Sequence, residues 1–332
     1  NSTFVAVGDT GTIITSYGVT TSNATVSNIS IDFSAVASNS YMYFEILTSF
    51  GGELYVASFY GGDIFRVSLE VAQDGTTTGV PSKIEPSFTA ASYYNTGLEV
   101  NPSYIRGLAS DGSQLYLADD SNDLIRKIDP LTSNITTIAG KLANYSDGIG
   151  ENAEFRRPYK LAMVGTDIYV LDDNRIRVLN SATGEVSTIK TTGVDYDHIS
   201  KWTSDGTDIY FFSQVYEYVD GNHIYTYKIY KLSPDGTVSE LDLVDENGAS
   251  YVIENYIRSL ASDGTDLFVS KDGTSRILQI ALQTGVVTEY TVEGDTNNFY
   301  PSDLNLMGGD LYGVSSNNVF KIELAGTNAT VS

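Results

Sequence analysis

The chain has 332 residues, 41% of them apolar, which is enough to bury a sizeable core in one large domain or two ordinary ones. Its 42 acidic and 19 basic residues give a net charge of −23, which disfavours nucleic acid and anionic lipid as partners. The absence of cysteine excludes disulfides and thiolate metal sites, and no apolar run approaches the roughly 18 residues of a membrane-spanning helix.

The first predicted elements lie within residues 1–34. The text FVAVGDTGTIITS places a glycine-containing turn between two β-prone runs, and NATVS, at residues 23–27, resembles the last strand of a sheet. The same five letters recur near the C-terminus, at residues 328–332. We therefore expect 1–34 to form a partial sheet that closes by pairing with C-terminal strands.

A second pattern repeats along the rest of the chain. Each copy has Asp-Gly, Gly-Gly or a single glycine for a tight turn, followed by a short apolar run with a central aromatic residue. Polar turns and two further β-rich runs follow most copies. The six copies are GGELYVA (51–57), DGSQLYLA (111–118), GTDIYVL (165–171), DGTDIYFF (205–212), DGTDLFVS (263–270) and GGDLYGV (308–314).

These units predict an all-β fold made of four-stranded antiparallel meanders. Runs such as LYLA are apolar at every position, so both faces of the sheet need cover, which stacking of consecutive sheets provides. The sequence therefore predicts a β-propeller in one domain, 1–332. Because residues 1–34 have their own turn and strands, we expect seven blades, with six as the alternative if that segment completes the last blade.

The stretch 137–179 resembles the repeats of NHL-type β-propellers. The resemblance lies in an Ala-Gly step, an Asp-Gly-x-Gly turn, Ala, Phe and Pro, an aromatic strand ending in Asp, and an Arg-Ile strand. These positions are Ala139, Gly140, Asp147, Gly148, Gly150, Ala153, Phe155, Pro158, Tyr169, Asp172 or Asp173, Arg175 and Ile176. Asp119, Asn122 and Arg126 match in the preceding unit. The resemblance implies the fold, and NHL-type propellers include binding scaffolds and a few enzymes.

Two pairs of adjacent acids follow equivalent strands, Asp119-Asp120 and Asp172-Asp173. Such pairs could bind Ca²⁺. Their recurrence at the same place in two units favours a structural role in the turn instead. We therefore predict no resident cofactor, with Ca²⁺ as the alternative.

Histidine occurs only at His198 and His223, so a metal-dependent or general-base enzyme has few residues to draw on. His198 precedes a strand that could face a central channel, and His223 lies in a long insertion. No Ser-His-Asp order and no paired-histidine spacing is present, and an enzyme would have to rely on Asp, Glu and backbone oxygens. We predict no catalytic and no metal-binding residues.

The insertion, residues 214–230, reads as an extended hairpin rich in tyrosine. In a strand, alternate side chains share a face, which places Tyr225 and Tyr227 on one side together with Ile229. Tyrosine offers a large contact area with a polar tip. We predict that this hairpin contacts a partner, with an elongated blade edge as the purely structural alternative. The predicted partner-binding residues are Tyr216, Tyr218, Tyr225 and Tyr227.

The acidic, cysteine-free composition, rich in Tyr, Ser, Thr and Asn, is typical of secreted and cell-surface proteins. We therefore expect an extracellular or cell-surface location, with the periplasm as the alternative. Sequons for N-glycosylation add candidate modification sites. They are Asn23, Asn28, Asn134, Asn144 and Asn328.

Together these features predict a non-catalytic propeller that binds or scaffolds a protein or a glycan. Further copies of the same chain are among the expected partners, because both ends carry the β-prone text NATVS. The alternative from another class is a metal-dependent lyase or hydrolase with a cation in the central channel.

Overall fold

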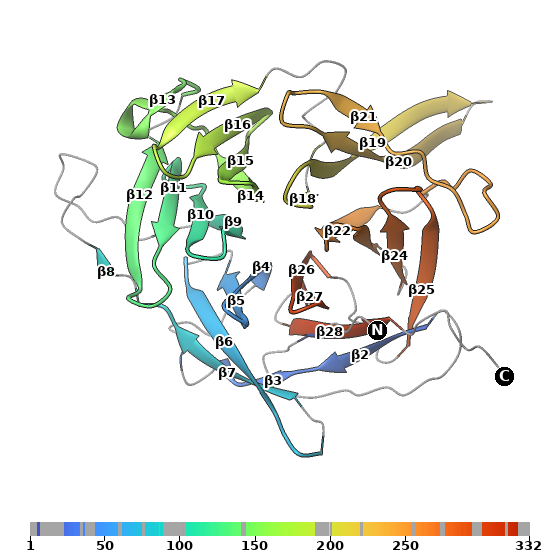
Figure 1. The fold of residues 1–332 in the computed structure, drawn as a ribbon, viewed down its shortest axis with the longest axis horizontal. Helices are drawn as coiled ribbons and strands as arrows, with labels where there is room; N and C mark the ends of the chain where they lie inside the picture. The colour runs from blue at the N-terminus through green and yellow to red at the C-terminus, as the bar shows by residue number, and fades with distance from the viewer. Residues whose placement is uncertain are drawn as a thin grey trace. The chain divides into compact units, whose positions relative to one another are not determined.

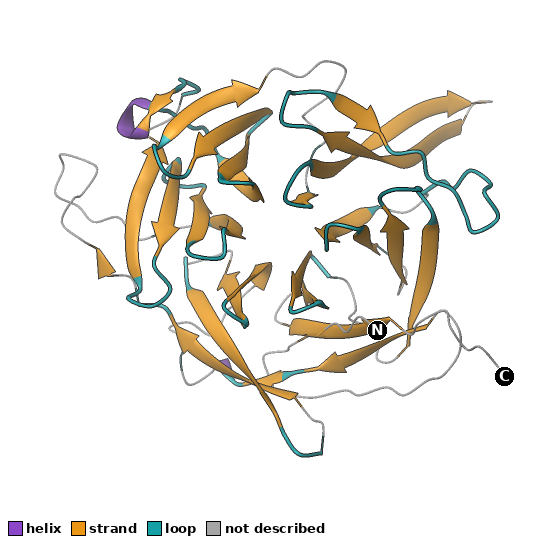
Figure 2. Cartoon of the chain, in the orientation of Figure 1, coloured by secondary structure: helices purple, strands orange, loops and turns teal. Residues whose placement is uncertain are grey.

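A computed structural model shows an all-β chain in which β-strands account for nearly all the regular structure (Figure 2). It describes residues 5–6, 23–33, 36, 44–58, 62–74, 77–85, 87–88, 102, 104–140, 144–189, 199, 201–219, 222–253, 256–272, 276–293, 301–315 and 318–324. Within these ranges the side chains of 5–6, 23–28, 30, 45, 87–88, 216–226, 292–293, 315 and 318 are not described. Contacts divide the chain into two compact units, one comprising Asp32–Val71 and Gly79–Thr191, the other Asn1–Ile31, Ala72–Thr78 and Thr192–Ser332. Each unit is described separately.

The unit that contains residues 79–191 is built from consecutive antiparallel meanders (Figure 1). The strands of its three meanders are β4 (Phe44–Phe50), β5 (Glu53–Ser58), β6 (Ile64–Val71) and β7 (Thr77–Lys83); β9 (Ile105–Ser110), β10 (Leu115–Asp119), β11 (Leu124–Ile128) and β12 (Asn134–Gly140); and β14 (Pro158–Val164), β15 (Asp167–Asp172), β16 (Arg175–Asn180) and β17 (Glu185–Ile189). Two short strands cover outer edges in this unit. They are β8 (Ser87–Phe88), parallel to β12, and β13 (Gly148–Ile149), antiparallel to β17.

The other unit contains three more meanders. Their strands are β18 (Trp202–Ser204), β19 (Ile209–Val219), β20 (Asn222–Leu232) and β21 (Val238–Glu240); β22 (Ile257–Ser262), β23 (Asp266–Lys271), β24 (Arg276–Ala281) and β25 (Val287–Glu293); and β26 (Asp303–Met307), β27 (Asp310–Ser315), β28 (Asn318–Leu324) and the N-terminal β2 (Asn23–Asn28). Meanders that stack face to face in series are the blades of a β-propeller. The described residues therefore form six blades.

The prediction of seven blades is wrong, and the pairing of β2 shows why. β2 runs antiparallel to β28, from Ala24 opposite Leu324 to Asn28 opposite Phe320, and so completes the last blade. The two-residue strand β1 (Val5–Ala6) also joins this sheet, between β2 and β28. β3 (Ser30–Ile31) follows β2. The sequence predicted that this segment pairs with C-terminal strands, as β2 does, and gave six blades as the alternative; it did not show that these strands complete the last blade instead of forming one of their own. Residues 7–22 of the predicted partial blade lie outside the described part.

The second strand of each blade carries the core, as its continuous apolar text predicts. All five residues of β10 are buried, and β15 and β23 each have five buried residues out of six. One cluster of buried side chains joins Tyr116 and Ala118 of β10 to Ile168 and Val170 of β15, so adjacent blades bury each other's faces. Such burial contributes about 25 cal/mol per Å² of apolar surface, which an isolated blade could not gain.

The repeated turn and the repeated aromatic residue are bonded to each other. Asp111 accepts hydrogen bonds from the backbone N–H groups of Ser113 and Gln114, and Gly112 takes a φ of +82° in the same turn. The hydroxyl of Tyr116 donates to the other oxygen of Asp111. Burial and this carboxylate raise the pKa of Tyr116 to about 12. The same arrangement recurs between Asp205 and Tyr210, so in these two copies the tyrosine hydroxyl is bonded to the aspartate of the preceding turn.

Candidate functional site

The first acid of each predicted pair is buried and bonded to an arginine on the next strand. Asp119, at the end of β10, lies 2.7 Å from Nε of Arg126 and accepts two bonds from the amide of Asn122. Asp172, at the end of β15, lies 3.0 Å from Nη1 of Arg177. In both blades the first acid of the pair therefore forms a buried ion pair with an arginine of its own blade.

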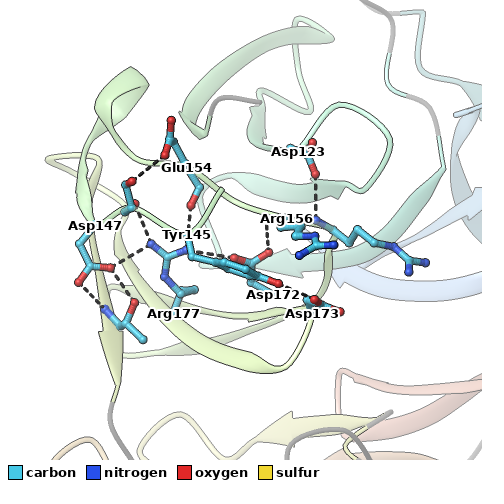
Figure 3. Close-up of polar contacts among 11 residues, drawn as sticks. Asp123, Tyr145, Asp147, Glu154, Arg156, Asp172, Asp173 and Arg177 are labelled. Atoms are coloured by element: carbon cyan, nitrogen blue, oxygen red, sulfur yellow. Dashed lines mark hydrogen bonds and ion pairs between the residues drawn. The ribbon is translucent and has the colours of Figure 1, made fainter. Parts of the chain in front are cut away.

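Arg177 also fixes the segment before β14 (Figure 3). Its side chain is fully buried, and it donates to the backbone oxygens of Ser146 and Glu154 at 2.9 Å and to Asp147 at 3.0 Å. Asp172 accepts the backbone N–H of Arg156 at 2.7 Å. Residues 146–156, which carry β13, are therefore held against the blade at several points. We call β14–β17 with β13 the anchored blade.

The two carboxylates on Arg177 differ in their pKa. Burial raises the pKa of Asp172 to about 6, despite the opposing hydrogen bond from Arg156 and the charge of Arg177. Burial also works to raise the pKa of Asp147, but hydrogen bonds from Thr188 and Arg177 outweigh it, so the pKa of Asp147 is lowered. The side chain of Asp147 is 51% exposed and that of Asp172 is fully buried. The two carboxylates bind the same arginine, but the difference in their burial gives them pKa shifts of opposite direction.

The second acids of the pairs are also engaged by protein groups. Asp120 lies within 4 Å of both Arg106 and Arg157, and burial raises its pKa. Asp173 accepts the hydroxyl hydrogen of Tyr145. Within the described residues, no three histidine, aspartate or glutamate side chains come together as a metal-binding group. His198 and the side chain of His223 lie outside that part of the chain.

The tyrosine-rich insertion is a two-stranded ribbon whose strands extend well beyond the neighbouring strands of their blade. β19 and β20 pair from Ile209 opposite Leu232 to Val219 opposite Asn222, with Tyr216 opposite Tyr225 and Tyr218 opposite His223. β18 pairs only with residues 209–211, and β21 only with 230–232. The side chains of Tyr216, Tyr218 and Tyr225 lie outside the described residues. We call β18–β21 the hairpin blade.

Tyr227 faces inward at the base of this hairpin. It is 8% exposed, lies edge-on to Phe212 and Tyr256, and its hydroxyl accepts a hydrogen bond from Gln214 at 3.0 Å. Its backbone N–H donates to the carbonyl of Ile253. Of the four predicted contact tyrosines, Tyr227 is therefore fixed in the blade, which leaves a small part of its surface for a ligand.

A hollow of about 580 Å³ opens beside Tyr227. It is lined on one side by the edge of β20 at Tyr227–Ile229 and on the other by wall residues 240–244, 248 and 250–252. After Leu241, which still donates its N–H to Ile229, the chain leaves the edge of β20 and returns only at Ile253. Between these points Val244 bonds to the backbone of Gly285 and Val287, next to β25. The outer wall of the hollow is therefore attached to the following blade.

The hollow combines charged, aromatic and apolar groups. Lys228 lies 2.9 Å from Glu240, and both side chains are about 40% exposed. Asp242 adds a second carboxylate, and Leu241, Leu243 and Val252 add apolar surface. The hydroxyl of Tyr251 donates to Glu289 at 2.6 Å, which fixes the ring. The sequence interpretation missed this hollow, and its only local signal was the turn text DENG at residues 245–248.

The described sequons differ in accessibility. Asn144 is exposed, whereas Asn134 is half-buried at the start of β12 and its side-chain oxygen is buried. Asn23 and Asn28 lie at the ends of β2, and their side chains are outside the described part, as is Asn328.

Comparison with known proteins shows the fold without fixing a family. No protein-family model matches the chain. The chain is 32% identical over 146 residues to the Arabidopsis thaliana protein SUPPRESSOR OF QUENCHING 1, chloroplastic, and the match covers 42% of this chain but 14% of that protein. The chain therefore spans only a small part of that curated relative.

Two solved structures resemble most of the chain. A streptogramin B lyase matches with a TM-score of 0.50 and 14% identity, covering 87% of this chain and 96% of the lyase. The Kuenenia stuttgartiensis hydrazine synthase matches with a TM-score of 0.51 and 16% identity, covering 87% and 97%. At these identities the likeness extends to the fold, which supports the β-propeller architecture and leaves activity open. Among the described residues, no helix has the length and hydrophobicity of a transmembrane segment.

Proposed function

We propose that this protein is a non-catalytic binding module for a protein or a glycan, and that the hollow of the hairpin blade is its ligand site. The hollow carries the proposal. Its volume of about 580 Å³ falls in the range of roughly 300–1,000 Å³ that is typical of ligand pockets. A ligand there would meet fixed tyrosine rings, backbone groups of the β20 edge and the apolar side chains of the walls.

The groups around the hollow suit recognition. The hydroxyl of Tyr227 accepts a hydrogen bond from Gln214, and that of Tyr251 donates one to Glu289. Because both rings are already fixed, a ligand would lose little affinity in ordering them. Lys228 is already engaged by Glu240, and these charged groups would hydrogen-bond a polar ligand. The hairpin that projects next to the hollow would extend the contact area through Tyr216, Tyr218 and Tyr225, which remain predicted contact residues.

Binding can be tested with paired arginine substitutions at two exposed valines. Val252→Arg, at a wall residue that is 54% exposed, places a long side chain at the mouth of the hollow, and Val71→Arg, at a residue that is 71% exposed on β6, is the matched control. Ligands selected on the native protein from a glycan array and a peptide library should bind Val252→Arg at least about tenfold more weakly. Equal binding to both variants, or an absence of ligands, would contradict the proposal.

The alternative remains a metal-dependent lyase or hydrolase with a cation in the channel. The two similar solved structures are named as a lyase and a synthase, so this fold supports catalysis in other proteins. Elemental analysis of purified protein, followed by a Ca²⁺ and Zn²⁺ titration monitored by thermal unfolding, separates the two functions. A binding module without a resident cofactor should contain less than stoichiometric metal and show no change in Tm.

We further propose that the propeller is of the NHL type. The support is the pair of equivalent strand-end aspartates, each bonded to an arginine on the following strand, in the two blades whose text matches that repeat. A sequence profile built from relatives of this chain should recover Asp and Arg at these positions in further blades. Variation at both positions would contradict the assignment.

We also propose that the protein acts outside the cell or at its surface, with the periplasm as the alternative. The acidic, cysteine-free composition and the exposed sequon at Asn144 support this location. Labelling of intact host cells with an antibody, before and after osmotic release of the periplasm, distinguishes the two compartments. Size-exclusion chromatography with light scattering tests whether copies of the chain also assemble with one another.

A further inference from the structure

The outer edge of the hairpin blade differs from the outer edges of other blades. Several other described blades have another segment of the chain along their outer strand, among them β8 along β12, β13 along β17 and β2 along β25 (Figure 1). In the hairpin blade the outermost strand is β21, with three residues, and no further strand pairs with it in the described part of the chain. Among the described residues, the outer edge of β21 therefore lacks the additional strand that lies along the outer edge of those blades.

The backbone groups that this edge offers can be identified from the register. Leu241 donates its N–H to Ile229, and Ser239 lies opposite Lys231, so residues 239 and 241 point their backbone groups toward β20. In an antiparallel pair the intervening residues point theirs the other way. Val238 and Glu240 therefore present their N–H and C=O groups outward. Ser239 and Glu240 are exposed, so an added strand can reach this edge.

The charges next to this edge favour a cationic occupant. Glu240 and Asp242 line the hollow together with one base, Lys228. The segment 241–253 adds Asp245 and Glu246 and contains no lysine or arginine, and the whole chain has a net charge of −23. An incoming cation is drawn to such a region, whereas an acidic peptide is repelled.

We propose that the hairpin blade binds an extended peptide segment, which adds to β21 as a further strand and places a lysine or arginine side chain in the hollow between Glu240 and Asp242. This inference rests on the proposed binding function and narrows its ligand to a basic, extended polypeptide. Backbone pairing at Val238 and Glu240 would supply sequence-independent affinity, and the hollow would supply selectivity for the cation. The apolar walls at Leu241 and Leu243 suit the aliphatic stem of such a side chain.

The probes are three end-capped peptides, Thr-Thr-Val-Thr-X-Thr-Val-Thr-Thr, in which X is arginine, norleucine or glutamate. Their affinities for the full chain are measured by fluorescence anisotropy at low and high salt. The arginine peptide should bind at least about tenfold more tightly than the glutamate peptide, and 0.5 M salt should shrink that ratio.

Two sets of variants separate the charge from the strand edge. Glu240→Gln combined with Asp242→Asn should reduce the preference for arginine over glutamate to less than about threefold, and Glu151→Gln, an exposed acid in the other unit, should leave it unchanged. Glu240→Pro removes the outward N–H while sparing the bond from Leu241 to Ile229, since an edge strand tolerates proline. It should weaken the norleucine peptide by about tenfold and the arginine peptide by more, because the carboxylate is lost together with the N–H, whereas Glu240→Gln should not weaken the norleucine peptide.

The outcomes distinguish this inference from the broader function. If ligands are lost in Val252→Arg but arginine and glutamate peptides bind alike, or only glycans bind, the binding function stands and the basic-peptide inference falls. If no ligand is sensitive to Val252→Arg, both fall. Should Glu240→Pro fail to fold, as judged by circular dichroism, the charge variants alone decide, and an unchanged arginine preference in them overturns the inference.

Discussion

The anchored blade and the hairpin blade use the same four-strand plan but treat their outer edges differently. In the anchored blade the buried Arg177 donates to three acceptors in residues 146–156 and to Asp172, and β13 pairs along β17. In the hairpin blade the outer strand stops after three residues, the next segment leaves the edge, and a hollow opens behind it. One blade therefore has its outer edge covered and fixed, whereas the other keeps an edge at β21 that no further strand of the described chain covers.

The largest effect should come from breaking the anchor. Arg177→Met leaves Asp172 buried without its cation and frees the backbone oxygens of Ser146 and Glu154. Removing one partner of a buried ion pair costs about 3–5 kcal/mol. Urea unfolding should show this loss, and Arg177→Met with Asp172→Leu should recover part of it. A loss under about 1 kcal/mol would mean that the anchor contributes no more than a surface ion pair.

The stability of the anchored blade should also depend on pH, through Asp172. The folded pKa of Asp172 is about 6, above the ordinary 3.8 of an aspartate, so the folded state holds this proton more tightly than the unfolded state. The stability from the protonated form is complete below pH 3.8 and is lost as pH rises through 6. A shift of this size corresponds to at most about 3 kcal/mol.

The measurement compares the native protein with Asp172→Asn by urea unfolding between pH 4 and pH 7. The difference in stability between them should change across this range, because the amide does not titrate. Parallel curves would contradict the assignment of the raised pKa to Asp172.

The hairpin blade can be perturbed through the attachment of its outer wall. Gly285 has a φ of +70°, and a Cβ there would lie 1.9 Å from the carbonyl oxygen of Asp242. Gly285→Ala should therefore displace the 241–253 segment, cost about 2 kcal/mol and weaken ligand binding at the hollow. Gly206→Ala is the control, because Gly206 has a φ of +91° with nothing within 4 Å of the added Cβ. It should lose stability through strain alone and keep its ligand affinity.

The smallest effect should come from Tyr251→Phe. The change removes the hydrogen bond to Glu289 but keeps the ring that lines the hollow. Loss of this hydrogen bond should lower the stability of the folded protein by about 1 kcal/mol. Thermal unfolding should register this loss, while binding of a norleucine-centred peptide stays within about threefold of the native value. A larger loss of binding would show that the hydroxyl contacts the ligand directly.

Much of the fold was predictable because its signals are local. The Asp-Gly turns and the apolar runs around Tyr116, Tyr210 and Phe268 fix the turn and the second strand of a blade whatever the neighbours are. The blade count stayed open between seven and six, because the sequence of residues 1–34 does not show whether its strands form a blade of their own or complete the last one, as β2 does by pairing with β28 about 300 residues away. Loop length does little to prevent such a pairing, since closure cost rises only with the logarithm of length.

The hollow could not be predicted for a related reason. It exists because residues 241–253 leave β20 and bond, through Val244, to Gly285 and Val287. This attachment depends on contacts between two blades and not on the local sequence of either blade. The ion pairs at Asp119 and Asp172 were indicated by their recurrence, but their arginine partners were recognised only as members of the repeat. Sequence periodicity therefore locates the strands, and long-range contacts decide where a ligand fits.

The pairing of β2 with β28 also constrains when the protein can finish folding. A ribosome that adds about 5–20 residues per second needs roughly 15–60 s to make the 290 or so residues that separate the two strands. Throughout that interval β2 has been made, but its partner strand β28 has not. The last blade therefore cannot be complete before β28 has been made.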